Sequence, residues 1–168
     1  TIKGPKVQLI GSGAILREVI EAASILEKDF KIAANVLSAT SFNELRKNAL
    51  EIERWNRLNP GKKKKSSHIE NTITDKKSPV IASTDYMKSF PEQISRFLPN
   101  KFIALGTDGY GRSDSREALR DFFEVNRYHV VLAAITALVD INKIDISILL
   151  KAAKNFKLDG NKLNPINN

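Results

Sequence analysis

The chain has 168 residues, of which 42% are hydrophobic and 27% charged, and this composition is typical of one globular domain with its own core. The absence of cysteine excludes disulfides and thiolate metal sites. The sequence shows neither a signal-peptide pattern nor a run of eighteen apolar residues, so we expect no membrane partner.

The formal net charge is +8, which suggests nucleic acid or an acidic protein as a partner. Half of this excess comes from Lys62–Lys65, in a stretch whose Gly, Ser, Asn and Thr residues predict a loop. No aromatic residues alternate with these lysines to stack on bases. We therefore interpret the run as solvated surface. A stand-alone basic module that binds nucleic acid or an acidic protein remains the alternative function, although we do not expect nucleic acid as a partner.

The first predicted strand is the apolar run 7–10, and Gly11-Ser12-Gly13 predicts a tight turn after it. From residue 14 to about residue 28, apolar residues recur at three- and four-residue spacing, which predicts a helix with one buried face. We expect Glu18 on the solvent side of this helix. The nearly continuous apolar run 32–37 predicts a second strand, covered on both faces.

Ser41, with a glutamate three residues later, has the spacing of a capping box and predicts a helix from residue 42 to about residue 58. Residues 61–78 are the most polar segment and are expected to form the most mobile loop. Ile69 and Ile73 are its candidate anchors.

Two further strands are predicted at 80–83 and 102–105. A helix is predicted between them, from about residue 86 to residue 97, and Pro91 should break it or mark its start. Asp114 has capping spacing with a glutamate and predicts a short helix that ends near residue 125.

The last third of the chain predicts helices. A strongly apolar helix is expected over residues 128–139, and Asp145 should cap another. Residues 161–168 form a polar tail. Because strands alternate with helices, we predict an α/β fold with three α/β/α layers and a mostly parallel sheet.

Residues 7–168 are expected to be a single domain, and residues 1–6 a truncated linker or an edge strand. Because the chain begins at Thr1 and not at a methionine, we expect a processed chain or a piece of a longer protein. In such sheets, functional loops lie beyond the carboxyl ends of the strands. These loops are Gly11–Gly13, Ser38–Ser41, Thr84–Tyr86 and Gly106–Asp114.

No complete catalytic constellation is found in these loops. The dinucleotide pattern at Gly11 is weak, because Leu16 replaces the third glycine and no acidic residue ends the second strand. Gly106–Gly111 lacks the Gly-Lys-Ser/Thr of a phosphate-binding loop, so a loop that packs on another domain or subunit is the better interpretation.

The charged residues of these loops leave alternatives open. An acid/base pair among Asp85, Asp108 and Asp114 is conceivable, and so is pairing of Arg112 and Arg116 with Asp108 and Asp114. We expect no catalytic, cofactor-binding or metal-binding residue in this chain. His129, which begins an apolar helix, is interpreted as a helix-end histidine with a satisfied hydrogen bond.

Five segments together resemble one family. They are VQLIGSGAILREVI from Val7, SATSFNELR from Ser38, ERWNRL from Glu53, ASTDYMK from Ala82 and LGTDGYGRSD from Leu105. They resemble the C-terminal domain of the homodimeric, bacterial-type decarboxylating component of the pyruvate dehydrogenase complex. The closing Asn164-Pro165 is similar as well. The resemblance covers nearly the whole chain from Val7.

The resemblance implies a cytoplasmic parent enzyme that uses thiamine diphosphate and Mg²⁺ to decarboxylate pyruvate and to acetylate lipoyl groups. The parent's first two domains hold the cofactor, so none should bind to this fragment, which is expected to be inactive alone. The implied fold is the transketolase C-terminal one, a mixed sheet of five strands with one antiparallel. We count four, and the fifth is expected at residues 1–3 or outside this chain.

The implied partners are the remaining domains and second subunit of the parent homodimer, and the dihydrolipoyl acetyltransferase component. The domain would give structural support and dimer contacts, or a docking surface for other components of the complex. The candidate contact residues are Asp85, Tyr86, Thr107, Asp108, Gly109, Tyr110, Gly111, Arg112, Ser113 and Asp114.

Overall fold

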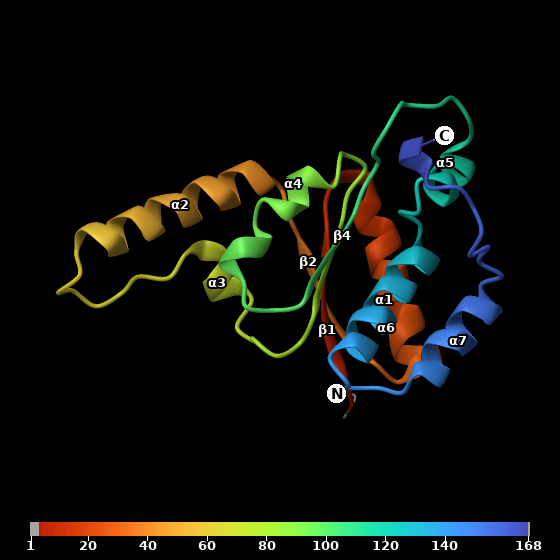
Figure 1. The fold of residues 1–168 in the computed structure, drawn as a ribbon, viewed down its shortest axis with the longest axis horizontal. Helices are drawn as coiled ribbons and strands as arrows, with labels where there is room; N and C mark the ends of the chain where they lie inside the picture. The colour runs from red at the N-terminus through yellow and green to blue at the C-terminus, as the bar shows by residue number, and fades with distance from the viewer. Residues whose placement is uncertain (1–3, 168) are drawn as a thin grey trace.

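The structure, a computed structural model, describes residues 4–167 and has a parallel sheet at its centre (Figure 1). The strands lie in the order β2-β1-β3-β4, and every neighbouring pair is parallel. They are β1 (Lys6–Gly11), β2 (Ala33–Ser38), β3 (Val80–Ser83) and β4 (Phe102–Leu105). The predicted α/β class is confirmed, but the antiparallel fifth strand is not among residues 4–167. Residues 1–3, where we expected it, lie outside the described residues.

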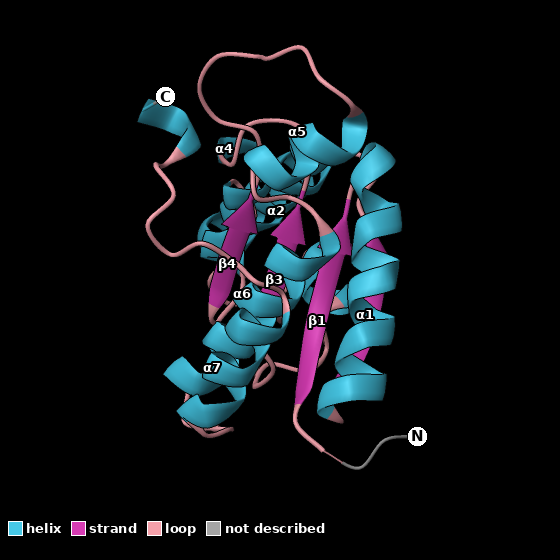
Figure 2. Ribbon diagram, turned by 90° about the vertical axis from the view of Figure 1, so that its right-hand side faces the viewer, coloured by secondary structure: helices cyan, strands magenta, loops and turns pink. Residues whose placement is uncertain are grey.

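Helices cover both faces of this sheet, as the three-layer prediction requires (Figures 1 and 2). One face carries α1 (Leu16–Phe30) and α6 (Arg127–Asp140), with α7 (Ile146–Asn155) packed on α6. The other carries α2 (Phe42–Leu58), α3 (His68–Thr72) and α4 (Ser89–Glu92). The short helix α5 (Arg116–Phe122) lies beyond the carboxyl ends of the strands. Three 3₁₀ turns complete the fold: η1 (Gly13–Ile15), η2 (Ser95–Phe97) and η3 (Pro165–Asn167).

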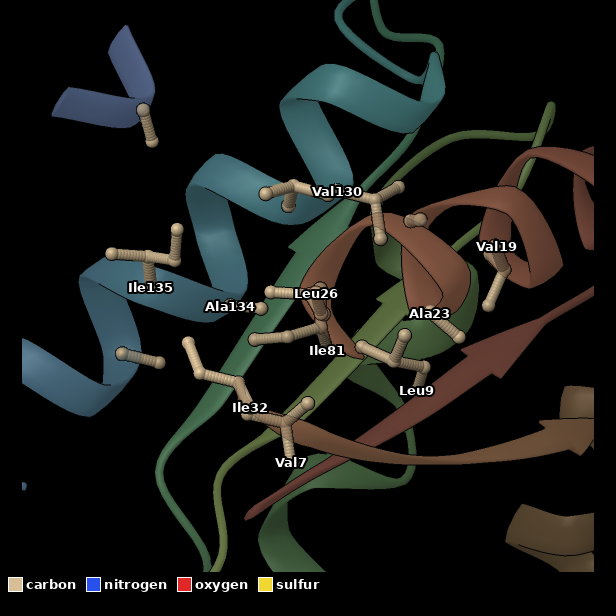
Figure 3. Close-up of a cluster of buried hydrophobic side chains, with 14 of the residues drawn as sticks. Val7, Leu9, Val19, Ala23, Leu26, Ile32, Ile81, Val130, Ala134 and Ile135 are labelled. Atoms are coloured by element: carbon tan, nitrogen blue, oxygen red, sulfur yellow. The ribbon is translucent and has the colours of Figure 1, made fainter. Parts of the chain in front are cut away.

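The sheet separates two hydrophobic clusters, because alternate residues of a strand point to opposite faces. Val7 and Leu9 of β1 belong to the cluster under α1 and α6 (Figure 3), whereas Ile10 belongs to the one under α2, α3 and α4. From α6, the first cluster receives Val130, Val131, Ala134, Ile135, Ala137 and Leu138, all buried.

This packing explains why α6 is so apolar. The segment Arg116–Asp140 is long and apolar enough to cross a membrane by length and composition alone. It is not one continuous helix, however, because residues 123–126 separate α5 from α6. Since α6 buries much of its surface against α1, α7 and the sheet, its apolarity follows from packing in a protein core.

Local signals predicted several elements to the residue. The bounds of α2, β3 and β4 are those expected, and the Ser41 Oγ accepts a hydrogen bond from the Glu44 amide at 3.2 Å.

The second strand contacts both hydrophobic clusters, as the prediction of cover on both faces requires: Ala34 and Val36 pack against the first cluster, and Leu37 packs against the second. This cover is incomplete, however. Because β2 is an edge strand, it contains no buried residue, and Asn35 is exposed.

The polar segment 61–78 is more ordered than expected. It contains α3, which a full capping box between Ser67 and Glu70 begins. Ile69 and Ile73 are 3% and 0% exposed, so their role as anchors is confirmed. The helix expected over 86–97 is divided into α4 and η2, and α4 includes Pro91.

Candidate functional site

The loops that follow β1, β3 and β4 meet at the carboxyl edge of the sheet (Figure 2). Hydroxyl groups join the first two of them: the Ser12 and Thr84 side-chain oxygens lie 2.9 Å apart. The Ser12 amide also donates to the Ser83 carbonyl at 3.2 Å. The parallel sheet thus brings together loops that are about 70 residues apart in the sequence, as its topology predicts.

Gly106 allows the loop after β4 to approach the loop after β3. A Cβ at this position would lie 2.6 Å from the Tyr86 carbonyl oxygen and 2.8 Å from the Lys88 amide nitrogen. The Thr107 amide donates to that carbonyl at 2.8 Å, and the Asp108 carboxylate accepts from the Lys88 amide at 3.0 Å. Any side chain at Gly106 would therefore push these two backbones apart.

Gly109 has a different function in the loop. Its φ of +88° is a left-handed conformation that glycine adopts without strain. A Cβ there would lie 3.2 Å from the Ile166 Cα, so the C-terminal tail passes directly over this turn. At Gly111, by contrast, a Cβ would meet no described atom within 4 Å, so packing does not require glycine there.

The pairing considered for Arg112 and Arg116 is wrong. Asp108 faces the loop after β3, where its carboxylate lies 3.7 Å from the Lys88 Nζ. Asp114 accepts a hydrogen bond from the Ser115 amide next to it. Within residues 4–167 neither arginine forms an ion pair, and the Arg112 guanidinium instead stacks 4.6 Å from the centre of the Phe122 ring.

The helix start was also misplaced by one residue. Ser115, not Asp114, caps α5, because its Oγ accepts from the Ala118 amide at 3.2 Å. This sets Arg116 and Arg120 one helical turn apart, at a spacing that places both on one side of α5.

A cleft of about 510 Å³ lies between the loop Gly106–Asp114, here called the glycine loop, the helix α5, and η1, which directly precedes α1. Its lining is Ala14, Ile15, Asp85, Thr107, Gly111, Arg112, Arg116, Leu119, Arg120, Phe123 and Val125. Four of the candidate residues meet there, namely Asp85, Thr107, Gly111 and Arg112. Tyr86 and Tyr110 do not line it and are 64% and 89% exposed. Sequence reasoning missed Arg120, whose four-residue spacing from Arg116 was the available signal.

Glu18 lies in a place that the sequence analysis did not predict. It was expected in solvent, but its side chain is only 6% exposed and lies between two arginines. Arg120 donates to Oε1 at 2.9 Å, and Arg127 donates from Nε to Oε2 at 2.9 Å and from its backbone amide to Oε2 at 3.1 Å. Because Glu18 is three residues after Ile15 and four before Ala22, it shares their buried face.

These contacts hold α5 and the start of α6 against α1. Burial by itself would raise the pKa of Glu18, but the hydrogen bonds and positive charge of Arg127, with the charge of Arg120, hold that pKa below its ordinary value. The same contact raises the pKa of Arg127, which is therefore charged throughout. Because its pKa is lowered, this buried carboxylate is not suited to act as a general acid. We therefore interpret the Glu18–Arg120–Arg127 cluster as a structural ion-pair network.

The two histidines have separate surroundings. The His129 Nδ1 lies 2.9 Å from the Asn126 side-chain oxygen at the cap of α6, and burial lowers the pKa of His129. The interpretation of His129 as a helix-end histidine is therefore confirmed. His68 begins α3 on the other face of the sheet. In the part of the chain that the structure describes, no group of three or more His, Asp or Glu side chains has the arrangement of a metal site.

The basic run has an aromatic partner that the sequence did not suggest. The Lys65 Nζ lies 3.9 Å above the ring of Trp55 on α2, and the Lys62 Nζ lies 5.7 Å from it. Asn56 holds the Lys65 backbone with two hydrogen bonds of 2.8 Å. The loop thus folds back on α2, and the tryptophan face is used for cation–π contacts.

Comparison with known proteins identifies the fold family. Residues 1–126 match the family model described as the transketolase-like TK C-terminal domain. The chain belongs to this family. The match covers the four strands of this transketolase-like C-terminal domain and the glycine loop.

Relatives of this transketolase-like C-terminal domain extend the comparison. The chain is 54% identical over 161 residues to the pyruvate dehydrogenase E1 component of Pseudomonas aeruginosa, a match that covers 95% of this chain and 18% of the relative. The protein of that name from Cupriavidus necator is 48% identical over 96% of this chain and 18% of its own length. The Escherichia coli K12 protein of the same name is 46% identical over 98% of this chain and 19% of its own length.

These matches confirm the resemblance seen in the sequence. The chain spans less than a fifth of the length of these relatives. Since they match at least 95% of the chain whereas the family model ends at residue 126, they share nearly all of the segment that forms α6 and α7.

Proposed function

We propose that this chain is the C-terminal domain of a pyruvate dehydrogenase E1 component, an oxidoreductase that decarboxylates pyruvate. The observation that carries this proposal is the 54% identity over 161 residues to a relative of which these residues are only 18%. The matching family model is itself described as a C-terminal domain. We place the enzyme in the cytoplasm, in a complex with the dihydrolipoyl acetyltransferase component.

In this proposal the domain supports the enzyme and does not carry its chemistry. Thiamine diphosphate and Mg²⁺ would supply the decarboxylation chemistry in the longer protein. Among residues 4–167, no group of three or more His, Asp or Glu side chains has the arrangement of a metal site, so the described residues do not fit Mg²⁺. We therefore assign no cofactor contact and no catalytic step to this chain.

The carboxyl-edge loops are the proposed contacts with the other domains and the second subunit. Tyr86, Met87 and Tyr110 are 64%, 52% and 89% exposed, and Ile166, beside Gly109, is 54% exposed. Large exposed aromatic and apolar side chains on adjacent loops are typical of surfaces that a protein partner covers. This supports a contact function for residues 85–86 and 107–114.

One experiment compares the isolated chain with the longer protein that its complete coding region specifies. With thiamine diphosphate and Mg²⁺, we expect the longer protein to reduce ferricyanide when pyruvate is added, and the isolated chain to show no such activity. A longer protein without pyruvate-dependent activity would contradict the proposal. Micromolar, Mg²⁺-dependent binding of thiamine diphosphate to the isolated chain would contradict the supporting role.

The same two samples test the contact loops by amide hydrogen exchange. We expect residues 85–86 and 107–114 to exchange more slowly in the longer protein, because a partner surface would exclude water from them. The exposed loop at Lys62–Lys65 is the internal control and should exchange equally in both. If these loops exchanged equally fast in the isolated chain and in the longer protein, no partner would cover them, and their contact function would be refuted.

A further inference from the structure

The cleft between the glycine loop and α5 has more positive than negative charge in its lining. Arg112, Arg116 and Arg120 contribute three guanidinium groups, whereas Asp85 contributes the single carboxylate. Arg120 directs its Nη1 to Glu18. Among the described residues, neither Arg112 nor Arg116 has an acidic partner. The three arginines and Asp85 give the lining a net charge of about +2, which the pairing of Arg120 with Glu18 reduces to about +1. Guanidinium groups recognise carboxylates and phosphates in particular.

The rest of the cleft is apolar. Ile15, Leu119, Phe123 and Val125 line it, and Ile15, Phe123 and Val125 are also core residues, which gives this wall a rigid support. Its volume of about 510 Å³ is within the range of small-molecule sites. A concave, mostly apolar surface with a few convergent charged groups is the usual form of a ligand site.

We propose that this cleft binds a small organic anion, in which a carboxylate or phosphate group is carried on an apolar body. The anionic group lies against Arg116 and Arg112, and the body covers Leu119 and Phe123. Asp85, on the loop after β3, accepts a hydrogen bond from a hydroxyl or ammonium group of the ligand, and it disfavours an anion that is charged at both ends.

Arg116 is the residue that tests this site most directly. It takes part in none of the ion pairs or cation–π contacts of the described residues, so its replacement removes little that the fold uses. Arg120 is unsuitable, because it also holds Glu18. Arg54 on α2 is a matched control, an exposed arginine outside the cleft lining.

The probe is phenyl phosphate, titrated into the isolated chain at neutral pH and moderate salt while amide NMR spectra are recorded. Phenol and inorganic phosphate are the controls for the body and the anion. We expect saturable shifts at Ile15, Gly111 and Leu119, and binding at least ~10-fold tighter for phenyl phosphate than for either part. Absence of saturable shifts at these residues would overturn the proposal.

The variants separate a specific site from general attraction by a basic protein. Arg116→Gln should weaken phenyl phosphate binding ~10-fold, because one charge-assisted hydrogen bond is lost, whereas Arg54→Gln should leave it unchanged. The same spectra show whether each variant is folded. If both variants weakened phenyl phosphate binding equally, net charge alone would explain the binding, and the proposed site would be refuted.

The longer protein gives the last comparison. The exposed side chains of the proposed contact surface, Tyr86 and Tyr110, do not line the cleft, so phenyl phosphate should also bind to the longer protein, and Arg116→Gln should weaken that binding as well. If the probe binds the isolated chain and not the longer protein, an acidic group of another domain fills the cleft, and the small-molecule assignment is wrong. Pyruvate-dependent activity is a separate readout, so failure of this site leaves the proposed function untouched.

Discussion

Glu18 shows how strongly one position can depend on distant residues. Its partners Arg120 and Arg127 are 102 and 109 residues away in sequence, and they are brought to it by the packing of α5 and α6. We expected Glu18 in solvent with the other charged residues of this helix, although its spacing from Ile15 and Ala22 is that of the buried face. What periodicity does not report is that a buried charge is tolerated there, because that depends on the two guanidinium groups.

We predict that Glu18→Gln lowers the free energy of unfolding at neutral pH by ~2 kcal/mol. This is below the usual loss for a buried pair, since Arg120 and Arg127 are 23% and 36% exposed and regain water. The pKa of Glu18 is lowered on folding, so its stabilisation is present above its ordinary value of 4.5 and is lost as the pH falls through the lowered pKa.

The measurement is urea unfolding of both proteins as a function of pH. The difference between wild type and Glu18→Gln should be largest near neutrality and should shrink as the solution becomes acidic below 4.5. Glu21→Gln is the control, because Glu21 is 54% exposed and lies 3.6 Å from the same Arg127, so its loss should stay below ~0.5 kcal/mol. If both variants lost the same free energy of unfolding, the stabilisation would not come from the buried ion pairs of Glu18.

At the scale of elements, helices with a local signal were predicted well. The predicted start of α2 was correct because Ser41 and Glu44 are only three residues apart, so their hydrogen bond depends on the local backbone alone. The start of α5 was wrong by one residue because Asp114 and Ser115 are both good caps, and only the backbone path of the glycine loop decides between them. The helix expected over 86–97 is divided after Glu92, although Pro91 lies in the first turn of α4, where a missing amide hydrogen is tolerated.

The cap of α5 can be tested with two single substitutions. Ser115→Ala should lower the free energy of unfolding by ~1 kcal/mol, because the Ala118 amide loses its acceptor. Asp114→Ala should lower the free energy of unfolding by less, since the Asp114 carboxylate accepts its hydrogen bond from the adjacent Ser115 amide. Chemical unfolding of both variants measures this, and the reverse order of losses would make Asp114 the cap.

The whole molecule depends on α6, although the family model ends before it. Six residues of this helix are buried in the cluster that also contains Leu9, Leu26 and Ile81. Without α6, the part of this face over β3 and β4 and the side of α1 that packs on α6 would be exposed to water. At about 25 cal/mol per Å², exposing roughly 400 Å² of apolar surface costs about 10 kcal/mol, which is comparable to the whole stability of an ordinary domain.

We therefore predict that a chain ended after Asn126 does not unfold cooperatively in urea and binds a hydrophobic dye. A chain ended after Leu158 is the matched control. It keeps α6 and α7 and loses the tail, whose Lys162 contacts the Asp121 and Phe122 carbonyls of α5, so it should unfold cooperatively with a modest loss. Cooperative unfolding of the shorter chain would show that α6 is dispensable to the core.

The candidate site was predicted in part. The sequence placed Asp85, Thr107, Gly111 and Arg112 on loops at one edge of a parallel sheet, and the cleft brings these four together. It did not place Leu119 and Arg120 of α5, or Phe123 and Val125 after it, which line the cleft because α5 packs across that edge. The pairing considered for Arg112 and Arg116 failed because Asp108 turns to the loop after β3.

The α/β alternation, the bounds of α2, β3 and β4, and the anchors Ile69 and Ile73 could be predicted from the sequence. Each of these follows from local backbone preference or from the periodic spacing of apolar side chains, which neighbouring residues express directly. Four features could not be predicted and come from the packed fold: β2 is an edge strand, Trp55 lies under Lys65, Glu18 is buried, and three arginines line one cleft. These features depend on contacts between segments far apart in the chain, and such contacts exist only after the helices have packed on the sheet.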